Sequence, residues 1–313
     1  MSTEQHDTNG PPVVWTRGSG CRELAEVISG DAAIQVDSDP AATCIRTGAG
    51  LIVSRRLSSF DLCSVAVPSG FSADETAGVV AAVGSGPHSS LAAGVARRIG
   101  RGLGVPARAV YAHGSSEPTP AAVRIVQDLD DQFPDLNIEA VSAASPEAMV
   151  QALPAGTLLV VGAPGGSWFQ RQFFGPGARI KHKASGGTIV VKAAPARVYQ
   201  VMGPPTAFGP HMRVADALAV GTGDAVVAAQ STLLGVVPSA TLGEADPDAE
   251  LGALASEAAF LAPEETIAYA RDLVDDTDGM TIPVVDASGN LIGVYRAAET
   301  DPPGLRWSSG VAE

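Results

Sequence analysis

The chain has 313 residues, of which 45% are hydrophobic and 17% charged, with 35 glycines and 23 prolines. This length predicts two or more domains, and the composition is typical of a turn-rich α/β protein, which excludes a coiled coil, a collagen-like fibre and a wholly disordered chain. Twenty Lys and Arg residues against 34 Asp and Glu residues give a formal net charge of −14. Because such a field repels phosphate backbones, we expect no nucleic-acid partner.

The cysteines and the first residues indicate the compartment. Cys21, Cys44 and Cys63 are the only cysteines, and an odd, sparse count without a C-x-x-C motif predicts no metal site and fits a reducing compartment. Residues 1–11, which we interpret as a disordered leader, carry no secretory signal, and no apolar run is long enough to span a membrane. We therefore expect a cytoplasmic protein without membrane insertion.

Short apolar runs alternate with helix-like segments up to residue 195, and this alternation predicts an α/β fold with a doubly wound parallel sheet. We expect a small degenerate βαβ unit at residues 12–75, packing on a domain at residues 76–195. The first is predicted to contain a helix at 22–28 and strands at 13–15, 33–36 and 50–54. The second is predicted to contain strands at 78–83, 107–112, 138–141, 157–161 and 187–192, and helices at 89–103, 119–133 and 146–153.

Residues 193–196 have the composition of a linker, and residues 196–313 follow a different rhythm. A helix followed by two short strands occurs twice there, and this recurrence predicts a tandem α+β repeat. The two copies are a helix at 214–218 before strands within 225–237, and a helix at 263–273 before strands within 282–295. The acidic charge gathers in this part of the chain, and we interpret it as a solvated face.

The glycine-rich stretch after the strand at 157–161 is the main candidate for a ligand site. Gly162-Ala163-Pro164-Gly165 follows that strand directly, and Gly175-Pro176-Gly177 comes after nine further residues. Glycines at the carboxyl end of a buried parallel strand let backbone N–H groups approach a phosphate. No Asp or Glu occurs between Ala148 and Ala215, whereas seven Lys and Arg residues do, and this favours an anionic ligand.

The spacing of Gly162, Gly165 and Gly175 resembles the G-x2-G-x9-G-[ST] signature of the universal stress protein family, over about residues 76–195. The resemblance implies an ATP or AMP site at the carboxyl ends of the strands. Its expected members, together with His113 at the end of a neighbouring strand, are Gly162, Ala163, Gly165, Gly175, Pro176, Gly177, Val83, Gly84 and Ser85.

Two of these positions depart from the family pattern. Pro176 replaces the Ser or Thr, and Gly84 stands where the family has an Asp on the adenine side. Proline removes both a hydroxyl and an N–H donor, which weakens the case for ATP. In the family the last strand, here within GGTIVV, usually mediates dimerisation, and this implies a homodimer.

The C-terminal repeat resembles a tandem CBS pair, or Bateman module, most clearly in IPVVDASGNLIGVY at residues 282–295. Such modules usually bind adenosine ligands, with a pattern G-h-x-[ST]-x-x-D whose acid contacts the ribose. The first copy, from Gly235, has lost the hydroxyl and the acid, whereas the second keeps Glu299, with Arg296 available to a phosphate. A CBS pair retained only for packing and dimerisation is the alternative.

The N-terminal stretch Trp15-Thr16-Arg17-Gly18-Ser19-Gly20 imitates the start of a dinucleotide fingerprint. The third glycine is replaced by Glu23, whose charge opposes a pyrophosphate. We therefore interpret residues 12–75 as a degenerate half of a stress-protein-like sheet.

No catalytic motif is present: the sequence contains no P-loop, no H-E-x-x-H and no nucleophile elbow. We expect an adenine-nucleotide-binding protein that senses stress or energy state, acts on an unknown protein target and has no catalytic activity of its own. The alternative is a ligand-free adaptor that uses both folds for dimerisation and for docking on a transporter or enzyme. Weak ATP hydrolysis rests on analogy of fold alone.

Overall fold

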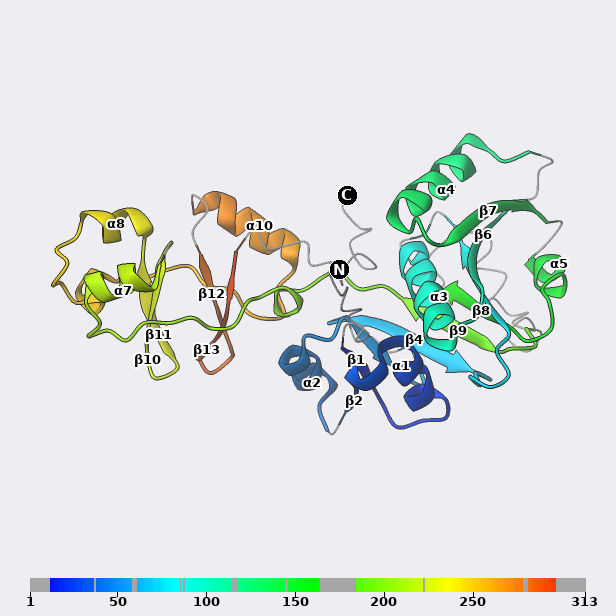
Figure 1. Cartoon of the computed structure of the whole chain (residues 1–313), viewed down its shortest axis with the longest axis horizontal. Helices are drawn as coiled ribbons and strands as arrows, with labels where there is room; N and C mark the ends of the chain where they lie inside the picture. Colours follow the sequence, from blue (N-terminus) through cyan, green and yellow to red (C-terminus); the bar gives the residue numbers. More distant parts are fainter. Residues whose placement is uncertain are drawn as a thin grey trace, which may run out of the picture. The chain divides into compact units, whose positions relative to one another are not determined.

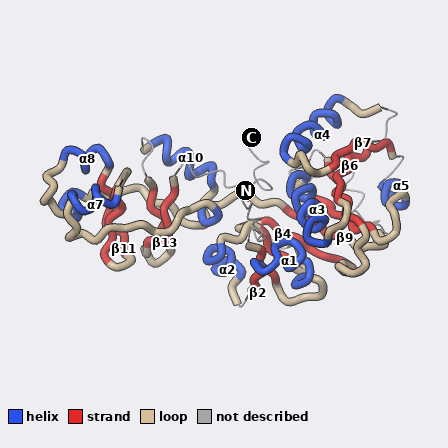
Figure 2. Tube along the Cα trace, viewed as in Figure 1, coloured by secondary structure: helices blue, strands red, loops and turns tan. Residues whose placement is uncertain are grey.

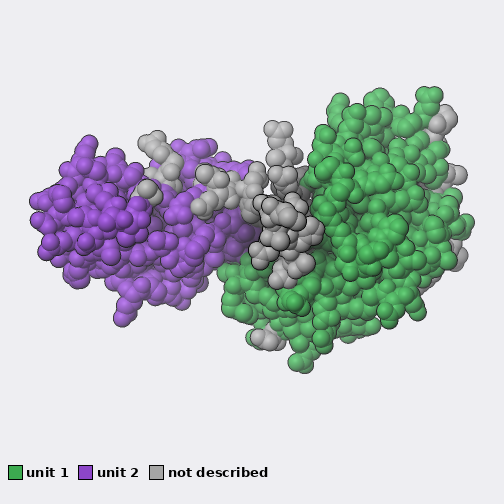
Figure 3. Space-filling view, in the orientation of Figure 1, with its two compact units in different colours: residues 1–195, 303–313 green, residues 196–302 purple. Residues whose placement is uncertain are grey.

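The structure is a computed structural model that describes residues 12–36, 38–57, 61–84, 86, 88–113, 117–143, 146–163, 184–221, 223–277 and 281–296. The chain divides into two compact units, unit 1 (residues 1–195 and 303–313) and unit 2 (Ala196–Pro302) (Figure 3). The division falls inside the stretch that has the composition of a linker.

Unit 1 is built on a nine-stranded sheet with the order β2-β1-β3-β4-β9-β8-β5-β6-β7 (Figure 1). The strands are β1 (Val13–Trp15), β2 (Ala33–Gln35), β3 (Leu51–Val53), β4 (Ser64–Ser69), β5 (Gly78–Val83), β6 (Ala107–His113), β7 (Asn137–Ser142), β8 (Thr157–Gly162) and β9 (Thr188–Lys192). Neighbouring strands are parallel except for β4 and β9, which are antiparallel. The predicted α/β class with a parallel-dominated sheet is confirmed.

Helices pack on both faces of this sheet (Figure 2). They are α1 (Cys21–Ser29), α2 (Pro40–Thr47), α3 (Ser89–Leu103), α4 (Pro120–Gln132) and α5 (Pro146–Gln151). Leu24 of α1, Leu91 of α3 and Leu129 of α4 share one core cluster with alternate strand residues, whereas Met149 of α5 belongs to a cluster on the opposite face. This alternation follows from the period of two along each strand, which sends successive side chains to opposite faces.

Residues 12–75, the first half of unit 1, and residues 76–195, the second half, are wound alike. In each half the first strand is central, its helix leads to a strand on one side, and the chain then crosses to the other side. The halves meet at the antiparallel pair β4 and β9, whose register centres on Val67 and Val190. Among the described residues the first half has one strand and one helix fewer, and it extends the same sheet rather than packing against it as a separate unit.

The expected role of the last strand in dimerisation requires a correction. β9 is hydrogen-bonded to β8 on one side and to β4 on the other. A second copy therefore has no open β9 edge with which to pair, because the first half of the same chain already occupies it. Homodimerisation by another route stays a prediction.

Unit 2 contains the helix, strand, turn, strand pattern twice. The first copy has α7 (Val214–Val220), β10 (Ala225–Ala229) and β11 (Thr232–Val237), followed by α8 (Ser239–Glu244) and α9 (Leu251–Leu254). The second has α10 (Ile267–Asp276), β12 (Ile282–Val285) and β13 (Leu291–Tyr295). α10 begins later than the predicted residue 263, because Thr266 caps it by accepting a hydrogen bond from the Tyr269 N–H.

The two hairpins of unit 2 share register and irregularity. Val227 pairs with Gly235 and Val284 pairs with Gly293, and each ladder then shifts at the next residue of the first strand. Asp286 stabilises the turn of the second hairpin, since its side chain accepts hydrogen bonds from Ser288 N–H and Asn290 N–H.

Two connecting segments tie these hairpins together. Gly203 bridges to Val294 while Phe208 bridges to Val227, and correspondingly Ser256 bridges to Val236 while Leu261 bridges to Val284. Each segment therefore contacts both hairpins. A Cβ at Gly235 would collide with the carbonyl oxygen of Ser256, and one at Gly293 would crowd Met202 and Gly203. Glycine at these equivalent positions thus permits the close crossing that joins the repeats.

Candidate functional site

The structure brings five of the predicted site residues to one edge of the sheet. Val83 is the last residue of β5, and Gly84 follows it in the chain. His113 is the last residue of β6. Gly162 is the last residue of β8, and Ala163 follows it in the chain. Because β5 lies between β6 and β8 and all three are parallel, these residues share the carboxyl edge of the second half. The other predicted members, Ser85, Gly165, Gly175, Pro176, Gly177 and Glu299, lie outside the described residues.

A hydroxyl closes the turn between β5 and α3. Ser89 Oγ accepts a hydrogen bond from Gly84 N–H at 2.9 Å and donates one to Gly84 O at 2.7 Å. The backbone groups of Gly84 are therefore both engaged within the turn. This is the position at which the family pattern has an Asp, and here a serine five residues later holds the same turn.

The described part of the glycine loop is buried. Gly162 pairs with Val191 in the ladder between β8 and β9, and Ala163 N–H donates to Val191 O at 2.6 Å. Ala163 is only 5% exposed. A phosphate at this edge therefore meets no free amide at Ala163, and its contacts would have to come from residues further along the loop.

The two histidines near this edge are both buried. His88 Nδ1 accepts a hydrogen bond from Ala193 N–H at 3.0 Å, which links the start of α3 to the chain just after β9. Burial and the nearby Lys192 charge lower the pKa of His88, so the ring is neutral and able to accept this bond. His113 is 7% exposed, and its carbonyl oxygen accepts from Ala143 N–H. His88 is thus a structural acceptor.

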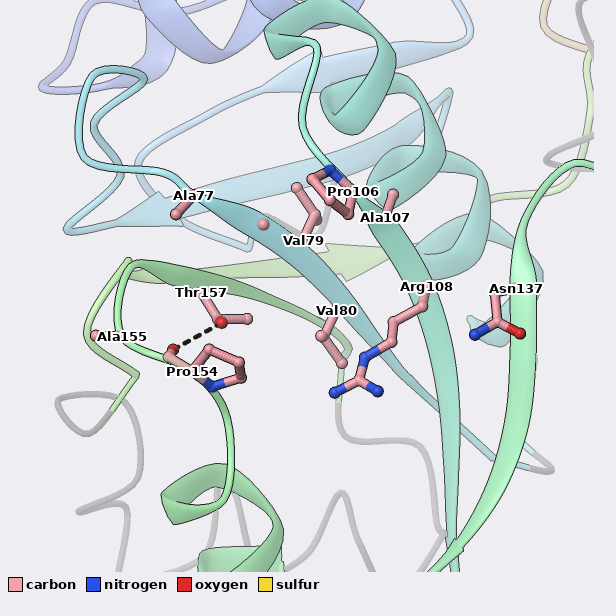
Figure 4. Close-up of a pocket in the computed structure, with 11 residues that line it drawn as sticks. Ala77, Val79, Val80, Pro106, Ala107, Arg108, Asn137, Pro154, Ala155 and Thr157 are labelled. Atoms are coloured by element: carbon pink, nitrogen blue, oxygen red, sulfur yellow. Dashed lines mark hydrogen bonds between the residues drawn. The ribbon is translucent and has the colours of Figure 1, made fainter.

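A hollow of about 450 Å³ lies at the opposite edge of the second half (Figure 4). Residues at the amino ends of the strands line it, among them Gly78, Arg108, Asn137 and Thr157. Thr157 Oγ1 donates to Pro154 O at 2.7 Å, and Arg108 Nη1 donates to Glu139 Oε1 at 2.6 Å. Two of its polar side chains are therefore already paired, and it lies away from every predicted site residue at the carboxyl edge.

One carboxylate of unit 2 is hydrogen-bonded to backbone groups of both repeats. Asp224, one residue before β10, accepts from Ser239 N–H at 2.9 Å and from Thr281 N–H at 2.7 Å. Ser239 begins α8 and Thr281 precedes β12, so the carboxylate bridges the end of one hairpin to the start of the other. Sequence reasoning missed Asp224, since it is one acid among many in unit 2 and its contact with Thr281 spans 57 residues.

Arg296, the described member of the predicted second-repeat site, is exposed directly after β13. The paired registers of the hairpins make Arg296 equivalent to Pro238, and Thr281 equivalent to Asp224. The equivalent ends of the two repeats therefore differ in charge: the first carries a carboxylate and the second a guanidinium.

Glu23 has a role that the sequence did not predict. Its Oε1 accepts a hydrogen bond from Ala73 N–H at 2.7 Å, which fastens α1 to the segment after β4. The carboxylate is thus committed to a contact within the fold. The expectation that it stands in the loop as a charge against a phosphate therefore needs revision.

Across the described ranges, no group of three or more His, Cys, Asp or Glu side chains is placed to hold a metal ion. None of the helices in the described part of the chain combines the length and apolar character that a membrane crossing requires. The three cysteines are free and buried, with Cys44 Sγ 3.6 Å from Cys63 Sγ.

No protein family model and no curated protein matches this sequence. The solved structures that it matches include the cytosolic domain of the Mg²⁺ channel MgtE in complex with ATP (21% identity over 33% of this chain and 47% of that chain). They also include CBSX2 in complex with AMP (23%, over 33% of this chain and 92% of that chain). A third is the CBS domains of a transcriptional regulator from Streptococcus pneumoniae (20%, over 33% of this chain and 94% of that chain). Each similarity has a TM-score of 0.31.

These similarities to CBS-domain structures extend over one third of this chain, and they span about half the length of the MgtE domain. The universal stress protein resemblance of residues 76–195 stays a prediction.

Proposed function

We propose that this chain is an adenine-nucleotide-binding regulatory protein, with its principal nucleotide site at the end of the second repeat of unit 2. The observation that carries the proposal is the charge difference between equivalent ends of two matched hairpins. Asp224 fills the first end with a carboxylate that accepts from Ser239 N–H and Thr281 N–H. The second end has Thr281 and the cation Arg296 instead.

The chemistry of these ends favours an anion at the second repeat, where the Arg296 guanidinium is present in addition to the Asp224 carboxylate that accepts from Thr281 N–H. A phosphate brought to the first end meets the Asp224 carboxylate and two N–H groups that are already bonded. A phosphate at the second end meets a guanidinium, whose fork of donors matches phosphate oxygens. The resemblance adds Glu299 as the acceptor for ribose hydroxyls. In a chain of net charge −14, a local cation of this kind is what an anionic ligand requires.

Regulation follows if ligand binding and the pairing of the repeats compete. Thr281 N–H donates to Asp224 across the two repeats, and the same residue borders the proposed site. A nucleotide that draws Thr281 toward itself weakens this link and favours a second arrangement of the hairpins. The size of the response is set by the difference in affinity between the two arrangements.

Isothermal titration calorimetry of the intact chain with ATP, AMP and cyclic AMP tests the proposal. We expect saturable binding of at least one nucleotide, and Arg296→Gln is expected to weaken it about tenfold, as loss of a charged hydrogen bond does. Arg213→Gln is the matched control, because Arg213 is an exposed arginine of unit 2 whose partner is Asp248. Absence of heat with all three nucleotides, or equal weakening by both variants, would contradict the proposal.

The ligand-free adaptor is a second candidate, and a specific observation favours it. Three N–H groups near the expected ligand positions are already bonded within the fold: Gly84 to Ser89 Oγ, Ala163 to Val191 O, and Ser239 to Asp224. Denaturing freshly purified protein and identifying released molecules by mass spectrometry separates the candidates. A released nucleotide favours the sensor, whereas an empty protein that also gives no heat on titration favours the adaptor.

The proposal also includes the absence of catalysis. The described histidines near the carboxyl edge are buried, and His88 is engaged as a hydrogen-bond acceptor. We expect phosphate release from ATP in the presence of the protein to equal that of a buffer blank. Sustained release above the blank would contradict this part of the proposal.

A further inference from the structure

Three arginines gather at the carboxyl edge of the first half. β1 ends at Trp15 and β3 ends at Val53, and Thr16 N–H donates to Val53 O at 2.9 Å, so the segments that follow these strands begin side by side. Arg17 lies in the first segment, and Arg55 and Arg56 lie in the second. All three side chains are exposed, and none makes a hydrogen bond or ion pair with a described residue.

Six other cations of the described residues have an acidic partner. The ion pairs join Arg22 to Glu26, Arg97 and Arg101 to Asp135, Arg108 to Glu139, Lys192 to Asp61, and Arg213 to Asp248. The described arginines that lack any side-chain partner are Arg17, Arg46, Arg55, Arg56 and Arg124. Arg46 and Arg124 are isolated on α2 and α4. Since the chain has many carboxylates, three arginines at one edge that have no acidic partner among the described residues favour a ligand that supplies the negative charge.

The arginines border the point at which the winding of the first half reverses. From β1 the chain passes through α1 to β2 on one side, and it later passes through α2 to β3 on the other. Where successive connections leave a parallel sheet in opposite directions, a crevice opens outside the carboxyl ends of the strands. Arg17 and Arg55 follow β1 and β3, the two strands on either side of this reversal.

Gly18 lets the Arg55 side chain cross the loop that leads into α1. A Cβ at Gly18 would collide with Cγ and Cδ of Arg55, so these atoms lie directly over the glycine. Burial raises the pKa of the Cys21 thiol, and the nearby Arg55 charge offsets part of this rise. Glu23, in the first turn of α1 after this loop, accepts a hydrogen bond from Ala73 N–H.

We propose that Arg17, Arg55 and Arg56 form a binding site for a small anion that carries at least two phosphate charges, such as a pyrophosphate group. One guanidinium group can donate two parallel hydrogen bonds to a phosphate, and three guanidinium groups at one edge of the sheet match a compact polyanion. A long polyanion such as nucleic acid is disfavoured, because the rest of the chain brings the net charge to −14. This site is separate from the nucleotide site proposed in unit 2.

Calorimetric titration of the full chain with inorganic pyrophosphate tests the site. We expect saturable binding, and Arg17→Gln, Arg55→Gln and Arg56→Gln are each expected to weaken it about tenfold. Arg124→Gln is the matched control, since Arg124 is exposed and unpaired but lies on α4 of the second half. Its affinity for pyrophosphate is expected to equal that of the unaltered protein.

Gly18→Ala separates the geometry of the site from its charge. This variant keeps all three arginines, but its new Cβ displaces the Arg55 side chain. We expect weaker pyrophosphate binding with an unchanged circular dichroism spectrum. The proposal is overturned if the unaltered protein gives no saturable heat, if Arg124→Gln weakens binding as much as the other substitutions, or if the Arg17, Arg55 and Arg56 triple variant keeps full affinity. Nucleotide binding that depends on Arg296 is expected to survive in every one of these variants, which keeps the two proposals distinguishable.

Discussion

The two halves of unit 1 follow one winding plan but present different chemistry at their carboxyl edges. In the second half, Ser89 and Val191 engage the N–H groups of Gly84 and Ala163, and the histidines are buried. In the first half, Arg17 and Arg55 extend from the same edge without a partner among the described residues. The sheet order therefore does not determine where a ligand binds, because the loops that follow the strands determine it.

The repeats of unit 2 teach the same lesson on a smaller scale. Their hairpins share register, irregularity and a glycine at the crossing, yet one end carries Asp224 and its equivalent carries Thr281. A duplicated fold thus gives two equivalent ends, and at the first of them the Asp224 side chain occupies the N–H groups that a ligand would use.

Gly187→Ala breaks the joint between the two halves of unit 1. Gly187 has a φ of +86°, and a Cβ there would collide with the carbonyl oxygen of Gly70, which follows β4. We expect a loss of about 2–4 kcal/mol of stability from strained backbone and displaced strands. Urea unfolding measures this loss of stability. Hydrogen exchange, followed separately in each unit, shows where the loss falls. The control is Gly78→Ala, whose Cβ meets ordinary contacts, and equal behaviour of both variants would contradict this account of the joint.

Gly102→Ala tests the packing of corresponding helices from the two halves. A Cβ at Gly102 of α3 would overlap the carbonyl oxygen of Val27 in α1, so the helices must separate. Overpacking of this kind is expected to cost about 1–3 kcal/mol. Thermal unfolding detects the loss, and faster amide exchange in α1 locates it. A variant as stable as the unaltered protein would show that the halves do not depend on this contact.

Asp224→Ala sharpens the comparison between the repeats. Removing the carboxylate leaves Ser239 N–H and Thr281 N–H without their acceptor, which is expected to cost about 1–3 kcal/mol. Hydrogen exchange is expected to accelerate at these two amides before it does elsewhere in unit 2. Asp272→Ala, an exposed acid on α10, serves as the control and is expected to leave both amides unchanged.

Acid titration gives the smallest expected effect. The pKa of His88 is lowered in the folded protein from an ordinary value of 6.5, so the unfolded chain binds a proton more readily. The contribution of the neutral ring is present above pH 6.5 and is lost as the pH falls through the folded pKa. His88→Asn is expected to flatten the stability profile in this range. An unaltered acid profile would show that His88 does not titrate on unfolding.

Periodic segments of the sequence predicted the fold well where contacts are local. The strand at 78–83 and the helix at 89–103 have the predicted bounds, because alternation and amphipathic spacing are direct signals. β4 was missed because Pro68 reads as a turn. Proline is tolerated there since β3 pairs only with residues up to Ala66, which leaves Pro68 without a partner strand on that side.

The candidate sites were less predictable than the fold. Gly84 and Gly162 were placed correctly at strand ends, but the hydrogen bonds that engage this edge come from Ser89 and Val191. Arg17, Arg55 and Arg56 form a candidate site because two loops lie side by side in the fold. The nearby carboxylate of Glu23 is bonded to another group. These are properties of long-range packing, and no local pattern in the sequence carries them.

Native mass spectrometry of the intact chain titrated with AMP and with ATP tests the central claim most directly, because it counts bound ligands. The account predicts a saturating adduct of one AMP, whose affinity falls about tenfold in Arg296→Gln and is unchanged in Arg213→Gln. Adducts no more abundant than those of an unrelated protein of similar charge would contradict the assignment of a nucleotide-binding function.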